Sequence, residues 1–128
     1  MPTFAMVAFL AVHGLLHAAI WLPHLTPDPD RPPPFQPDHS GVLAAVAVPH
    51  LVERRLAVWL AVATTVLYLF AAAAIPSDSS WSTSVVIAAA GVGIGMKVLF
   101  FHPWFILGLL LDLLVLSAAV LAWPVALP

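Results

Sequence analysis

Two histidines four residues apart lie in a stretch that is otherwise apolar, AVHGLLHAAIWLPH. Residues four apart share one face of a helix, so His13 and His17 are spaced like two ligands of a metal or haem iron on one helix. Such a site needs at least a third ligand, which would have to come from His102, His24 or Asp112. The same imidazoles could instead hydrogen-bond to polar groups of neighbouring helices and hold them together.

Asp112 stands alone in a second apolar stretch, LGLLLDLLVL. An aspartate in hydrocarbon is costly unless it is paired or protonated, which makes it a candidate functional residue by default. Its candidate partners are His13 and Lys97. A hydrogen bond to His13 would orient the imidazole for a metal, and the same groups could also titrate along a proton or ion pathway. For Lys97 itself we favour a surface position, with its long stem lifting the ammonium to the lipid headgroups.

The composition of the chain says where these residues must lie. Of 128 residues, 62% are hydrophobic and only 8% are charged, with a mean hydropathy of +1.06. Soluble proteins carry roughly 25% charged residues, so the sequence predicts an integral membrane protein with the lipid bilayer as its first partner. The net charge of −2 gives no indication of nucleic-acid binding. Cysteine is absent, which excludes disulfides and thiolate metal sites.

Four apolar runs are each about long enough to cross a bilayer, and prolines mark most of their ends. They predict helices over residues 3–22, 54–75, 83–101 and 104–123. The first run has no basic residues before it, as a signal peptide would, so we expect it to remain as a helix. The fold class is therefore all-α: one domain over residues 1–128, a four-transmembrane-helix bundle with a proline-rich loop between the first and second helices.

That loop, residues 23–52, holds eight of the thirteen prolines and is expected to be a stiff cover over one end of the bundle. Its later part, SGVLAAVAVPHL, is apolar but too short to span, which favours an interfacial or re-entrant segment. We call this end of the bundle side B, and the end that holds both termini side A. The chain's cations are on or near side B: Arg31, Arg54, Arg55 and Lys97. By the positive-inside rule the loop is cytoplasmic and the protein lies in the inner (plasma) membrane.

Counting inward from side B at 1.5 Å per residue places the polar residues by depth. His13 lies roughly 13 Å down the first helix and Asp112 roughly 12 Å down the fourth, so they share a layer, which Thr64 and Thr65 of the second helix also reach. We therefore expect a polar intramembrane site of His13, His17, Asp112 and Lys97, open to side B. Glu53, Arg54 and Arg55 are expected to form a solvated helix start, and His24, His39 and His50 receive no specific role.

The stretches HGLLHAAIWLP and HPWFILGLLLDLLVL resemble small uncharacterised four-helix membrane proteins of bacteria such as actinomycetes. The resemblance implies the bundle but no catalytic residues, and the chain has no motif of a hydrolase or a nucleotide-binding enzyme. Three functions stay open: binding of a metal or haem, an accessory subunit of a larger membrane complex, and a proton or ion pathway. Gly91 and Gly95, at GxxxG spacing, would suit packing within the monomer or the seam of a homo-oligomer.

Overall fold

The structure is a computed structural model that describes residues 2–22, 36–77 and 79–121, and these residues contain helices and no strand. In chain order the elements are α1 (Pro2–Trp21), α2 (Gly41–Ala45), α3 (His50–Ala74), α4 (Ser82–Leu99), the short 3₁₀ helix η2 (Pro103–Phe105) and α5 (Ile106–Val120). Within the described residues, four helical segments are long and apolar enough to cross a membrane. The fourth of them consists of η2 and α5 together. The all-α class is confirmed for these residues, as are four helices long and apolar enough to span a membrane, close to the predicted positions.

The ends of the helices differ from the predicted ends by up to four residues. The largest shift is at α3, which begins at His50 because Pro49 precedes its first turn. The carbonyl of Pro49 accepts hydrogen bonds from the backbone N–H groups of Val52, at 2.9 Å, and Glu53, at 3.1 Å. Proline suits the start of a helix, since its fixed φ is compatible there and its missing N–H would have no partner in the helix. The second span is consequently about one turn longer than its apolar run.

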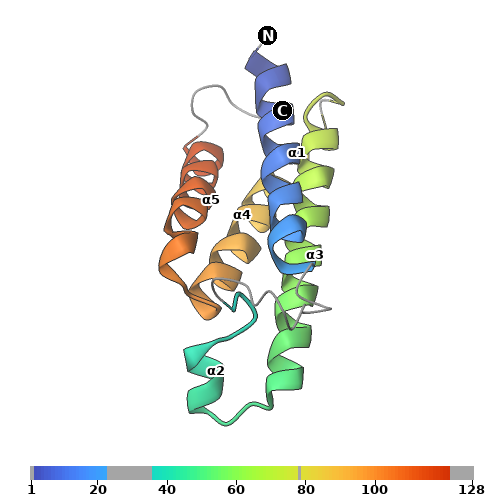
Figure 1. The fold of residues 1–128 in the computed structure, drawn as a ribbon. Coiled ribbons are helices and arrows are strands. Elements are labelled where there is room, and N and C mark those ends of the chain that lie inside the picture. Colours follow the sequence, from blue (N-terminus) through green and yellow to red (C-terminus); the bar gives the residue numbers. More distant parts are fainter. Residues whose placement is uncertain (1, 23–35, 78, 122–128) are drawn as a thin grey trace.

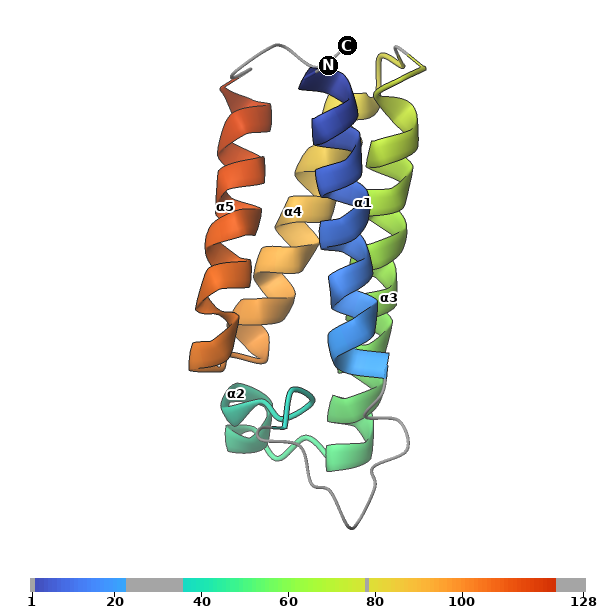
Figure 2. The same cartoon turned by 45° about the horizontal axis from the view of Figure 1, so that its top comes forward.

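The four spanning helices form an arc in which each packs on the next (Figure 1). The order in space is α1, α3, α4 and α5, so α1 and α5 are the two outer members. Side A, at the top of Figure 2, holds the start of α1 and the end of α5, and α2 lies at the opposite end, side B. The outward faces of α1 and α5 carry many exposed large apolar side chains, as expected of surfaces in contact with lipid.

Two apolar clusters fill the bundle, one in each half. The side-A cluster is built on Leu10, Tyr68, Ala71, Ala72, Ile75, Val86, Ala89, Ala90, Val115 and Ala119. The side-B cluster is built on Trp21, Ala57, Ala61, Met96, Phe100 and Phe105. The buried polar residues of the spans lie for the most part between these two clusters. The bundle is therefore apolar, polar and apolar again along its long axis.

The connection between α1 and α3 is described from residue 36 onward. The proline-rich stretch before it, with His24 and Arg31, lies outside the described residues, so the predicted stiff cover stays a prediction. The short apolar segment forms only the five residues of α2, at the side-B end of the bundle. Ser40 caps α2, because its hydroxyl oxygen accepts a hydrogen bond from the backbone N–H of Leu43.

Glu53 is not solvated, and that part of the predicted helix start is wrong. Its side chain is buried and accepts a hydrogen bond from the backbone N–H of Ser40. Its Oε1 also lies 3.4 Å from Nδ1 of His39. The reason is the early start of α3, which places Glu53 under the segment before α2. Arg54, one residue on, pairs with Asp38 at 3.8 Å.

Gly91 and Gly95, the GxxxG glycines, do not pack against the other described helices. A Cβ atom added at Gly91 or Gly95 would meet no atom within 4 Å. Gly93, between them, is the close contact of α4: a Cβ there would lie 2.6 Å from Oδ2 of Asp112. Packing within the described monomer therefore depends on Gly93, and a role for the other two glycines in a homo-oligomer stays a prediction.

Gly93→Ala is expected to destabilise the protein by about 1–3 kcal/mol, the usual cost of overpacking a tight contact. The added methyl group would overlap a carboxylate that other residues hold in place. The matched control is Gly91→Ala, which adds the same methyl group to the same helix in open space and should be neutral or slightly stabilising. Unfolding of both variants in mixed detergent micelles measures the difference, and equal stability of the two would contradict the contact.

Candidate functional site

The carboxylate of Asp112 is the centre of the buried polar residues. It is fully buried and accepts three hydrogen bonds from three other helices. Oδ1 accepts from Nε2 of His13, at 2.6 Å, and from the hydroxyl of Tyr68, at 2.7 Å. Oδ2 accepts from Nζ of Lys97, at 2.6 Å. A buried aspartate is tolerated when it is paired with a cation and its remaining oxygens are hydrogen-bonded, which is the case here.

Lys97 does not reach the headgroups, so the predicted surface position is wrong. Its side chain is only 4% exposed, and its ammonium contacts both Asp112 Oδ2 and His17 Nε2 at 2.6 Å. Helical side chains lean toward the helix N-terminus, which for α4 is side A, so the stem points away from the side-B headgroups. Gly108 of α5 leaves room for it, since a Cβ atom there would lie 2.8 Å from Cε of the lysine.

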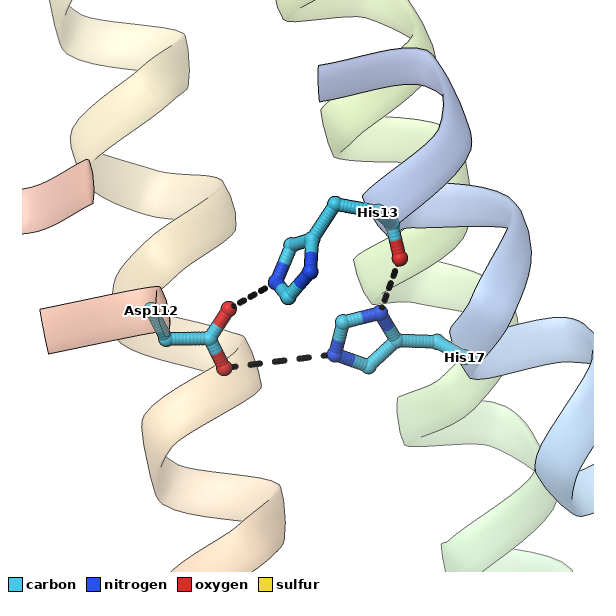
Figure 3. Close-up of side chains that lie close together, drawn as sticks. All are labelled: His13, His17 and Asp112. Atoms are coloured by element: carbon cyan, nitrogen blue, oxygen red, sulfur yellow. Dashed lines mark hydrogen bonds and ion pairs between the residues drawn. The ribbon is translucent and has the colours of Figure 1, made fainter. Parts of the chain in front are cut away.

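The hydrogen bonds of His17 identify its tautomer. Nδ1 lies 3.0 Å from the backbone carbonyl of His13, and a carbonyl only accepts, so this nitrogen carries a proton. Nε2 then has a lone pair, which accepts from the ammonium of Lys97. This Nε2 also lies 3.9 Å from Oδ2 of Asp112, the longer dashed line of Figure 3. His17 is therefore a neutral imidazole whose free nitrogen faces a cation.

Rings on three sides hold the imidazole of His13. Phe9, one turn earlier on α1, stacks on it with 5.6 Å between centroids. His17 and Tyr68 meet it edge-on, at 5.1 and 5.0 Å. Figure 3 shows the two imidazoles of α1 pointing at the carboxylate of α5 across the bundle. The aromatic contacts thus fix the direction of Nε2, and the hydrogen bond to Asp112 joins the two outer helices.

A close approach of α1 and α3 places the histidines beside Tyr68. A Cβ atom at Gly14 would lie 2.6 Å from Cβ of Tyr68, so only glycine permits this spacing. Thr65 strengthens the contact by donating its hydroxyl proton to the carbonyl of Gly14, at 2.9 Å. Thr64 instead bonds within its own helix, to the carbonyl of Leu60. We call the five convergent residues His13, His17, Tyr68, Lys97 and Asp112 the polar cluster; all four spans contribute to it.

The structure brings together the four residues predicted for the intramembrane site, and it adds Tyr68. Tyr68 was not singled out from the sequence. Its Cα lies nearer side A than the layer of His13 and Asp112, but its side chain leans toward the N-terminus of α3 and so reaches back to the carboxylate. One signal in the sequence could have identified it. It is the only tyrosine of the chain, it lies in an apolar run, and a buried tyrosine hydroxyl usually has a hydrogen-bond partner.

His102 lies apart from the polar cluster. Its Nδ1 accepts a hydrogen bond from the backbone N–H of Trp104, at 3.3 Å, and caps η2. Within the described residues, the group whose ligand atoms could share one metal ion is His13, His17 and Asp112, with those atoms within 4.8 Å of one another. Of the three third ligands considered, this geometry brings Asp112 to the pair and not His102, while His24 lies outside the described residues.

No protein-family model matches the chain, and neither a curated protein nor a solved structure matches it. What the protein does is therefore inferred from the geometry of the polar cluster.

Tyr68→Phe is expected to lower the free energy of unfolding by about 1–2 kcal/mol, because Asp112 loses one of its three donors inside the membrane. Thr64→Val is the matched control. It also removes a buried hydroxyl from α3, but one that bonds only within its own helix, and its effect should be clearly smaller than that of Tyr68→Phe. Detergent unfolding followed by tryptophan fluorescence measures both, and a control as destabilised as Tyr68→Phe would refute the assigned bond.

Proposed function

We propose that the protein moves protons across the membrane, with the polar cluster as the exchange site near the middle of the bilayer. The observation that carries the proposal is the position of Lys97. Its ammonium is shared between an anion, Asp112 Oδ2, and a neutral acceptor, His17 Nε2, at the same distance of 2.6 Å. A proton on Lys97 thus has an acceptor on either side, and chains of Asp, His and similar groups carry protons in pumps and transporters.

The surroundings of the cluster favour a carrier over an open pore. Apolar clusters lie on both sides of it along the bundle, and all five polar side chains are buried, so the described residues show no opening like the one expected toward side B. Secondary transporters place their coupling-ion sites near the bilayer midplane, and access alternates between the two sides. In this arrangement the protein is a multi-pass protein of the plasma membrane. Side B faces the cytoplasm, as the placement of Arg54 and Arg55 at the start of α3 favours.

Proton flux into liposomes tests the proposal. Purified protein is reconstituted with a pH-sensitive dye inside, and a potassium gradient with valinomycin supplies the driving force. Wild type should acidify the lumen faster than empty liposomes, and Asp112→Asn should lose the excess rate. Ser117→Ala, an exposed change on the same helix, should leave it intact. The proposal would be contradicted if liposomes with wild-type protein acidified no faster than empty ones, or if the Asp112→Asn protein kept the full flux.

A metal ion is a second candidate for the same site, because His13, His17 and Asp112 present three ligand atoms within 4.8 Å. Two histidines and one carboxylate with open positions are a known set for iron or zinc. Such an ion would have to displace the ammonium of Lys97, which lies between two of the three ligands. Elemental analysis and an absorption spectrum of protein purified with supplemented iron, zinc or haem test this, and protein without metal or haem would exclude it.

A further inference from the structure

Residues 36–48 close the side-B end of the bundle, and we call this segment the side-B cap. Its centre is Ser40, which is fully buried and bonded to two different helices. The hydroxyl of Ser40 donates to the carbonyl of Leu99, at 2.5 Å, in the last turn of α4. The backbone N–H of Ser40 donates to the carboxylate of Glu53 in the first turn of α3. The cap is thus tied to α3 and α4 at one residue.

An aromatic layer separates the cap from the polar cluster. Trp21, at the end of α1, donates its indole N–H to the carbonyl of Pro37 in the cap, at 2.9 Å. The same indole stacks on Phe105, with 4.7 Å between ring centroids. The indole also stacks on the imidazole of His17, at 6.4 Å between centroids. The path from side B to the cluster is therefore closed first by the cap and then by a tryptophan that the cap holds in place.

The cap has few apolar contacts beside these polar ones: Leu43 packs on the side-B cluster and Pro37 is buried. α2 has no buried residue, and Val42 and Val46 are largely exposed. A segment with little buried apolar surface opens more readily than a packed helix. Ala47, just after α2, has a positive φ of 58°, which L-residues other than glycine rarely adopt, and Pro49 follows two residues later. The backbone is thus strained at Ala47, close to the junction with α3 about which a displaced cap would rotate.

We propose that the side-B cap is a gate: it closes the cluster toward side B when Ser40 and Trp21 are bonded, and it opens that side when these bonds break. The inference deepens the proposed proton function and rests on it, since a gate matters only for a site that exchanges with side B. Opening releases the carbonyl of Leu99 and the carboxylate of Glu53 to water and frees Trp21 to turn away from Phe105.

Cysteine accessibility tests the gate, because the chain contains no native cysteine. Thr64→Cys places a reporter behind the aromatic layer, on a fully buried position one helical turn from Tyr68. A charged methanethiosulfonate reagent is added to membrane vesicles of both orientations. Adding Ser40→Ala and Glu53→Ala together should raise the rate of modification from side B by about tenfold or more, because the closed state loses its bonds. The rate from side A should not change.

Two controls separate a gate from general loosening. Ser77→Ala removes a hydroxyl that also bonds a carbonyl in the last turn of a helix, but at side A, and it should leave the reporter protected. Ala71→Cys, a fully buried reporter in the side-A cluster, should stay protected when the cap is weakened. An unchanged rate at Thr64→Cys, or an equal rise at both reporters, would overturn the gate. Labelling needs no proton flux, so a failed flux assay with a positive result here would refute the function and leave the cap as a moving segment.

Discussion

Lys97→Met should destabilise the protein by about 3–5 kcal/mol, the range measured when one partner of a buried ion pair is removed. Methionine matches the length of the lysine stem and keeps its contact with Gly108. What it removes is the ammonium, which leaves the fully buried carboxylate of Asp112 without a cation and Nε2 of His17 without a donor. The charge of Asp112 would then have to be neutralised by a proton, at a cost to folding at neutral pH.

If the two charges are coupled, removing the second one should restore stability that is lost when only the first is removed. Asp112→Asn alone leaves a buried ammonium unpaired, but together with Lys97→Met it removes both charges and keeps an oxygen for His13 and Tyr68. The double variant should therefore recover most of the stability lost by either single variant. Unfolding of all four proteins in mixed micelles gives the coupling free energy. Arg55→Met, which removes an exposed cation from α3, should change stability by less than about 0.5 kcal/mol. Losses that simply add would show that the two charges are not coupled.

Most of the fold follows from the sequence, since runs of about twenty apolar residues bounded by prolines have one stable solution in lipid. Depth counting from the helix ends also placed His13 and Asp112 in one layer, because the rise per residue is fixed. The structure confirms this pair with a hydrogen bond of 2.6 Å. Helix lengths and the rise per residue therefore predict which residues lie at the same depth in the bundle.

Lys97 and Tyr68 could not be placed by height alone. The lean toward the helix N-terminus carries Lys97 toward side A and Tyr68 toward side B, so that both reach the carboxylate of Asp112. Their positions also require that α4 and α3 be rotated to face Asp112, which depends on small residues of the partner helices such as Gly108 and Gly14. A single sequence does not say which glycines lie opposite which long side chains.

The burial of Glu53 was missed for a related reason. Charged residues at the start of a span are usually solvated, and nothing in the local sequence indicates that Ser40, thirteen residues earlier, folds back onto this helix. The bond depends on the path of the connection between α1 and α3. Sequence patterns predict helices far better than the course of such connections, so the cap appears only in the structure.

The double variant Asp112→Asn/Lys97→Met separates a structural cluster from a functional one, and it should be folded but inactive in proton flux. Every group of the polar cluster is hydrogen-bonded, so a network that only holds helices together would give the same geometry. Removing both charges keeps the shape of the site and its bonds to His13 and Tyr68. It removes the acid and the base between which a proton would pass, and a neutral amide and a thioether cannot replace them.

We therefore expect this double variant to unfold near the wild-type midpoint and to show no flux above that of empty liposomes. Ser117→Ala, carried through the same reconstitution, shows that the preparation itself preserves transport. If the double variant is stable and also retains the wild-type rate, the polar cluster is a structural lock, and the protons do not pass through its two charges. If it is stable and inactive, the two charges serve transport, because the fold has then been shown to be stable without them.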